Sequence, residues 1–289
     1  MTYPAKGYGT YGPDPWRQTS WDARAAGNFV CGGAGAGLIA FSVFAGTTGS
    51  YAPVLILAGL ALVGLGLFCV SLELGRPLRA INVIRNPRTS WMAREAWVAG
   101  ALFPAGIVAA LVAPVVAWVA AILALAFVYC QSRLLQGAKG IPAWREPLLV
   151  PLVVLTGLTE GGGIFIATIP LHRTAPLALL TLFGVLVMVR LSVWIAYRRR
   201  LDGSLAEGAR TALDRAGIVL LVLGTAVPLC MIAIAASIAL SAGVVSALCV
   251  AIGLAATLAG AWLKFAIVTR AGFNQGFALP HLPVRGVAR

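Results

Sequence analysis

Long apolar runs dominate the chain, and short polar segments separate them. Eight runs are long enough to cross a bilayer, because about 20 apolar residues in a helix span its hydrocarbon core. We therefore predict an all-α integral membrane protein with eight transmembrane helices, arranged as two four-helix bundles. The predicted spans lie near residues 28–46, 53–72, 96–113, 115–132, 149–169, 176–196, 217–240 and 244–267.

The spans divide the chain into two helical halves and three polar segments. The first half would occupy residues 28–132 and the second 149–267, with a loop over 133–148 between them. An N-terminal segment, 1–27, and a C-terminal tail, 268–289, complete this division. The N-terminal segment contains prolines and tryptophans and has no apolar core before a small-residue cleavage site, so we expect no cleaved signal peptide.

Charge is scarce and lies on one side of the predicted spans. Only 11% of the residues are charged, whereas soluble domains carry about a quarter, yet the net charge is +13. With eight spans, Arg173 is the one Lys or Arg in the connections opposite the termini. Since Lys and Arg are retained in the cytoplasm, both termini should be cytoplasmic, in a bacterial or archaeal inner membrane. The positive charge then indicates contact with membrane lipids and a soluble partner, and no nucleic acid.

The supply of metal-ligating residues argues against several cofactors in this chain. The five cysteines form no CxxC pair and lie within the predicted spans, whereas iron–sulfur clusters need grouped thiolates. The two histidines, His172 and His281, lie outside the spans, so we expect no haem between the helices. Gly33 and Gly37 form a GxxxG pair, which we interpret as a close helix contact and not as a nucleotide-binding loop.

Charged residues inside the spans are candidates for function, because ionisable groups are costly in a bilayer. Glu160 lies well inside the fifth span and Arg190 well inside the sixth. Because a short connection makes these spans neighbours, we predict a buried Glu160–Arg190 pair with a structural role, and a proton relay is the alternative. Glu73 and Glu95 lie nearer the inner interface, where ion pairs with nearby arginines would be the simplest role.

The segment over residues 72–97, LELGRPLRAINVIRNPRTSWMAREAW, carries the most specific pattern. Judged from its residue types alone, this segment is a basic loop with two turn signals, and it could bind lipid phosphates. Its sequences ELGRP (73–77) and NPRTSWM (86–92), placed after the second span, resemble the NrfD, polysulfide reductase and DMSO reductase membrane-anchor family. Residues 16–38 are most similar to the membrane subunits of phenylacetyl-CoA:acceptor oxidoreductases.

This resemblance implies a quinone-reactive anchor that exchanges electrons with quinone and holds no haem or iron–sulfur cluster of its own. Its partners on the cytoplasmic face would be an iron–sulfur electron-transfer subunit and a molybdopterin catalytic subunit, with phenylacetyl-CoA as one candidate substrate. The positions that match the quinone-binding residues of the family are Asn28, Glu73 and Tyr129. The residues expected to hold the partner subunit or lipid phosphate are Arg76, Arg88, Trp91 and Arg94.

Two other function classes fit the same pattern. A secondary transporter would explain eight spans and an embedded Glu160, although no clear inverted repeat supports it. A purely structural anchor without a quinone site is the third class. No acid or histidine lies in the outer half of any predicted span, so we expect electroneutral chemistry without proton pumping.

Overall fold

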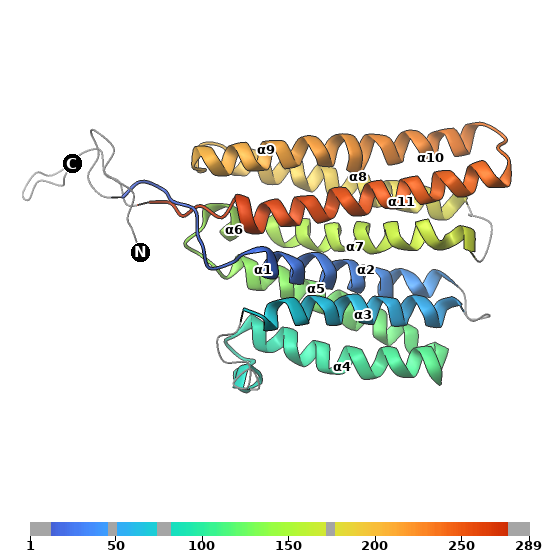
Figure 1. The fold of residues 1–289 in the computed structure, drawn as a ribbon, viewed down its shortest axis with the longest axis horizontal. Helices are drawn as coiled ribbons and strands as arrows, with labels where there is room; N and C mark the ends of the chain where they lie inside the picture. Colours follow the sequence, from blue (N-terminus) through green and yellow to red (C-terminus); the bar gives the residue numbers. More distant parts are fainter. Residues whose placement is uncertain (1–12, 46–50, 74–81, 172–176, 277–289) are drawn as a thin grey trace, which may run out of the picture.

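The computed structural model describes residues 13–45, 51–73, 82–171 and 177–276, and every structural statement below refers to these residues. Eight helical segments in this part of the chain are long and apolar enough to cross a membrane, which confirms the predicted fold class. They lie side by side along one common direction (Figure 1).

The first half of the chain supplies four of these segments. The first consists of α1, η1, α2 and η2, and the others are α3, α4 and the η4–α5 pair. Their bounds are α1 Ala23–Gly27, η1 Asn28–Gly32, α2 Gly33–Ser42, η2 Val43–Ala45, α3 Tyr51–Ser71, α4 Trp91–Leu111, η4 Pro114–Val116 and α5 Ala117–Gln136.

The second half supplies the other four, after the short loop helix α6, Pro142–Arg145. The seventh segment begins at Glu207, earlier than the predicted 217, because its first turns are helical but too polar to count as an apolar run. The bounds are α7 Leu149–Thr168, η5 Ile169–Leu171, α8 Leu177–Arg200, α9 Glu207–Leu221, η6 Val222–Ala226, α10 Val227–Ser237, α11 Ala242–Phe265 and η7 Ala266–Arg270.

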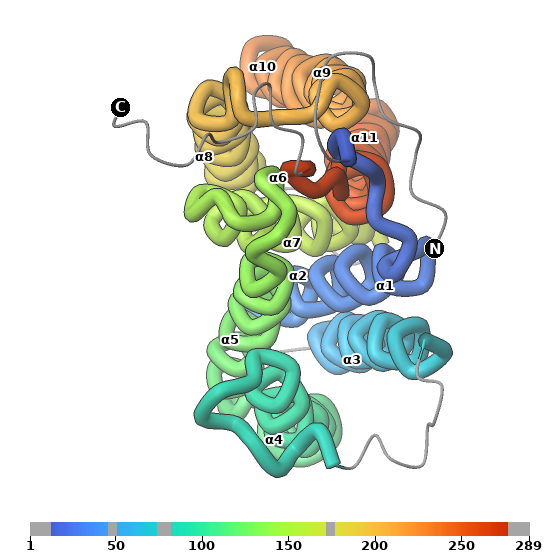
Figure 2. The backbone as a smooth tube through the Cα atoms, turned by 90° about the vertical axis from the view of Figure 1, so that its left-hand side faces the viewer, coloured from blue at the N-terminus to red at the C-terminus, as the bar shows by residue number. Residues whose placement is uncertain are grey.

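Helices α2 and α7 join the two halves through glycines. A Cβ atom on Gly37 would lie 2.2 Å from the carbonyl oxygen of Gly157, and one on Gly161 would lie 2.0 Å from the backbone nitrogen of Leu38. Only glycine permits backbones to approach this closely. The GxxxG interpretation of Gly33 and Gly37 is confirmed, and α2 and α7 lie next to each other in the middle of the molecule (Figure 2).

The described ends of the chain meet at one end of the bundle. The backbone nitrogen of Gln18 donates to the carbonyl of Gly272 at 2.8 Å, and that of Asn274 donates to the carbonyl of Trp16 at 3.1 Å. We call this the basic end, because it also carries the connections over residues 82–90 and 137–148, which contain Arg85, Arg88, Lys139 and Arg145, and the end of α8 with Arg198, Arg199 and Arg200.

Candidate functional site

A cavity of about 190 Å3 lies at the basic end of the first half, between η1, α3, α4 and α5. Most of its wall is apolar, and its principal polar side chains are Asn28 and Glu95, both almost completely buried. The apolar part of the wall includes Leu67, Val70, Met92 and Leu134.

Three buried polar side chains form what we call the Asn28 cluster: Asn28, Glu95 and Gln131. The Nδ2 of Asn28 donates to Oε1 of Glu95 at 3.4 Å. The Nε2 of Gln131 donates to the backbone carbonyl of Asn28 at 3.0 Å and to its Oδ1 at 3.2 Å. The Oε1 of Gln131 is buried and has no hydrogen-bond partner among the described residues. A ligand in the cavity would therefore meet hydrogen-bonding groups at Asn28 and Glu95, held in place by Gln131.

The wide π-helical turn η1 explains how the cluster is held. Such turns displace backbone carbonyls from the regular helical ladder and are frequent at functional sites. In η1 the carbonyl of Asn28 accepts from Gln131, and the next carbonyl, that of Phe29, accepts from the Nζ of Lys264 in α11. Two side chains from other helices therefore satisfy neighbouring carbonyls and fix the turn that carries Asn28.

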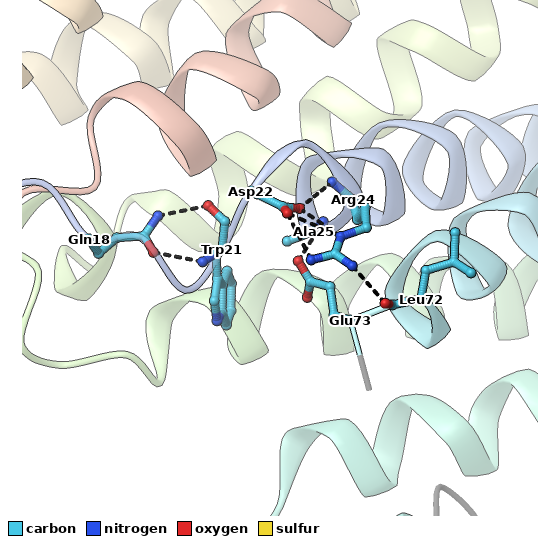
Figure 3. A network of polar contacts seen from close by, with 7 residues as sticks. All are labelled: Gln18, Trp21, Asp22, Arg24, Ala25, Leu72 and Glu73. Carbon is cyan, nitrogen blue, oxygen red and sulfur yellow. Dashed lines mark hydrogen bonds and ion pairs between the residues drawn. The ribbon is translucent and has the colours of Figure 1, made fainter. Parts of the chain in front are cut away.

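Glu73, a predicted quinone-binding residue, lies just beyond the end of α3 and does not line the cavity. Its Oε1 accepts from the backbone nitrogen of Ala25 at 3.1 Å, in the first turn of α1, where a carboxylate is favoured by the helix dipole (Figure 3). Burial raises the pKa of Glu73, and the nearby Asp22 carboxylate raises it further. Hydrogen bonding to Arg24 lowers the pKa of Asp22 itself.

Tyr129, the other predicted quinone ligand, also lies outside the cavity lining and is 43% exposed. Its ring is nearly perpendicular to that of Trp91, with an interplanar angle of 83° and ring centroids 5.8 Å apart. The guanidinium groups of Arg94 and Arg133 lie 4.1 Å and 4.9 Å from the centre of the same indole ring. Tyr129 therefore belongs to an aromatic and cationic group on the exposed side of α4 and α5.

The predicted docking residues have different environments. Arg88 is exposed, whereas Arg94 donates to the carbonyls of Pro87 and Arg88, each at 2.7 Å, and so orders the turn before α4. Trp91 is partly buried beneath Arg94. Arg76 lies outside the described residues.

The prediction of a Glu160–Arg190 ion pair is wrong, because Glu160 has a different partner. Glu160 forms its ion pair with Lys264, and both side chains are buried. Arg190 instead donates to the hydroxyl of Thr159 at 2.7 Å and to the carbonyl of Gly224 in the π-helical turn η6 at 2.6 Å. The prediction considered only spans adjacent in sequence, whereas α7 packs extensively against α11.

Three buried residues were missed as site residues: Glu95, Gln131 and Lys264. A signal existed for Lys264, because it is the one lysine within any predicted span. Glu95 was assigned to the interface because hydropathy begins the third span at residue 96, whereas α4 begins at Trp91 and places Glu95 one turn inside. No pattern in the sequence places Gln131 opposite the carbonyl of Asn28, since that contact depends on the packing of α5 against η1.

The chain matches one family of known proteins over most of its length. The match covers residues 25–265 and is to the DMSO reductase anchor subunit (DmsC) family. No curated protein matches the chain. The match includes all eight helical segments at least in part, together with the Asn28 cluster and the Glu160–Lys264 pair. The chain therefore belongs to the DMSO reductase anchor subunit (DmsC) family, and it is a membrane anchor subunit of a DMSO reductase-type molybdoenzyme complex.

Proposed function

We propose that this chain is the quinone-reactive subunit of its complex and holds a quinone ring in the cavity beside Asn28. The observation that carries this proposal is the Asn28 cluster, which places a few polar groups at the wall of an otherwise apolar cavity. Ligand sites commonly combine an apolar slot with a small number of such groups. A volume of about 190 Å3 suits a single ring, since an apolar cavity of about 150 Å3 can hold benzene.

The residues of the cluster have different roles at the quinone oxygens. A bound quinone supplies two-electron, two-proton chemistry. Asn28 presents its Nδ2 donor to one oxygen, and the carboxyl of Glu95 gives or takes the proton there. Gln131 holds the backbone and the side chain of Asn28 in place. Because the cavity is apolar, each of these polar contacts acts without competition from bulk water.

Glu73 and Tyr129 have roles at the border of this site in our proposal. Glu73 lies at the basic end, two residues after the lining residue Ser71, and it would exchange protons between the aqueous phase and the cavity. Its raised pKa brings proton exchange closer to neutral pH. Tyr129 would act from the lipid side, since its contact residue Trp91 directly precedes the lining residue Met92.

The basic end is, in our proposal, the cytoplasmic docking face for the iron–sulfur and molybdopterin catalytic subunits. The one-sided placement of Lys and Arg supports this orientation. The cavity lies at the same end of the bundle, so electrons would have only a short path to the nearest cluster of the partner. The similarity of residues 16–38 to phenylacetyl-CoA:acceptor oxidoreductase subunits keeps phenylacetyl-CoA as one candidate substrate of the complex; the family match itself points only to the DMSO reductase type.

Turnover of the purified complex tests the quinone site. We expect Glu95→Gln to lower quinone-linked turnover about 100-fold or more, since a positioned proton donor or acceptor contributes on that scale. Reaction of the catalytic subunit with an artificial dye should not change, because the dye bypasses the anchor. Ser132→Ala is the matched control, because the hydrogen bond that its buried hydroxyl makes among the described residues stays within α5, to the backbone carbonyl of Tyr129. Normal quinone turnover in Glu95→Gln would contradict this proposal and favour a purely structural anchor.

A further inference from the structure

A second cavity at the basic end has a different composition from the quinone cavity. It is an open cavity of about 630 Å3 between α9, η7, the end of α11 and the N-terminal segment, and three exposed arginines line it: Arg17, Arg215 and Arg270. Among the described residues of its lining, Glu207 is the one carboxylate. Figure 2 looks onto this end, where the N-terminal segment lies between the ends of α9 and α11. The cavity therefore has an excess of positive charge.

The positive charges of the three arginines are not balanced by ion pairs with described carboxylates. Among the described residues, none of them takes part in an ion pair. The nearby Asp214 is engaged by Arg198. Pairing of the chain ends fixes the position of Arg17, which lies opposite Phe273 in an isolated antiparallel bridge. Arg270 lies over the ring of Trp262, 4.6 Å from its centre.

The start of helix α9 adds hydrogen-bond donors to the same cavity. Helix α9 begins at this cavity with Glu207, and no side chain in the described part of the protein caps its first turn. Free donors at a helix start attract anions. Together with the arginines, they fit a group that carries negative charge and several acceptor oxygens, such as a phosphate.

The surroundings indicate that this phosphate belongs to a lipid. Ile218, one turn after Arg215 on α9, is 63% exposed, and Leu258, one turn before Trp262 on α11, is 59% exposed. Helices α9 and α11 contact each other, so these side chains continue the cavity into an apolar surface that would face acyl chains. Basic pockets between helices at the cytoplasmic side of a membrane bind phospholipid headgroups in this way.

We propose that this arginine cavity, lined by Arg17, Arg215, Arg270 and Trp262, binds the phosphate headgroup of an anionic membrane phospholipid. The site is separate from the quinone cavity, and the two share no lining residue within the described ranges. The bound lipid would stabilise the junction of α9, α11 and the paired chain ends.

Native mass spectrometry of the full chain, supplied with phosphatidylglycerol or phosphatidylcholine, tests this site. We expect retention of phosphatidylglycerol over phosphatidylcholine. Arg215→Gln and Arg270→Gln should each weaken phosphatidylglycerol binding about fivefold, the usual contribution of one basic residue at an anionic membrane surface. The matched control is Arg210→Gln, an exposed arginine on the same helix that does not line the cavity and should leave binding unchanged.

Further variants and a competing ligand distinguish lipid binding from the other possible results. Arg270→Lys should restore most of the binding that Arg270→Gln loses, because it restores the positive charge. Equal retention of the two lipids, or equal losses in Arg215→Gln and Arg210→Gln, would overturn the proposal. Full displacement by inorganic phosphate would identify a soluble anion as the ligand. Loss of partner-subunit binding with unchanged lipid retention would identify an acidic protein segment.

Discussion

Lys264 offers the sharpest test of how the two halves of the chain are held together. Its Nζ pairs with Glu160 of α7 and donates to the carbonyl of Phe29 in η1, and its side chain is 1% exposed. Lys264→Met removes the charge and keeps a side chain of similar length. Stranding one member of a buried ion pair costs about 3–5 kcal/mol, and an unsatisfied buried carbonyl adds about 1–3 kcal/mol. Because such costs overlap, we expect a loss of about 4–6 kcal/mol in the free energy of unfolding.

Denaturation in detergent micelles, followed by near-ultraviolet circular dichroism, measures this loss. The double variant Lys264→Met/Glu160→Gln should be more stable than Lys264→Met alone, since neither charge is then left unpaired. Lys139→Met is the control, because Lys139 is exposed in the loop after α5 and its loss should change stability little. A cost of less than about 1 kcal/mol for Lys264→Met, or no recovery in the double variant, would refute the ion-pair reasoning.

Three further predictions concern packing, orientation and pH. Gly161→Ala should destabilise the chain by about 3 kcal/mol in the same denaturation assay, because its Cβ would collide with α2, whereas Gly100→Ala has open space and should be neutral; equal effects would contradict the α2–α7 contact. In intact cells, an impermeant maleimide should label an introduced Ser241→Cys and not Ser204→Cys, since the basic end is proposed to be cytoplasmic, and the reverse pattern would invert the orientation. Burial raises the pKa of Glu73, so the folded protein is destabilised when this side chain is charged. Glu73→Gln should therefore raise the melting temperature at a pH above the pKa of Glu73 and leave it unchanged in acid. A higher melting temperature in acid alone would contradict this reasoning.

The sequence predicted the membrane fold well because hydropathy and charge placement are local signals. All eight spans appear near their predicted positions, and the largest shift is at α9, whose polar first turns are helical outside the apolar run. The Gly33–Gly37 contact was also predictable, because glycine spacing on one helix is visible without knowing its neighbour.

The buried polar contacts were not predictable to the same degree, because they join helices far apart in the sequence. Lys264 reaches Phe29 across most of the chain, and Gln131 reaches Asn28 from the fourth span. Neither contact follows a spacing rule, since each depends on how η1 departs from regular helix geometry. The Glu160–Arg190 prediction failed for the same reason: adjacency along the chain was a poor guide to which cation faces Glu160.

Photochemical labelling tests the central claim most directly. The purified complex would be illuminated with a photoreactive naphthoquinone analogue, and the labelled peptides would be mapped by mass spectrometry. The proposed site predicts labels on residues 67–71 of α3 and 92–96 of α4, which line the cavity beside Asn28, and their loss in the presence of excess unmodified quinone. Competed labels on α8 to α11 instead, or no competed label on the chain, would contradict a quinone site at the Asn28 cluster.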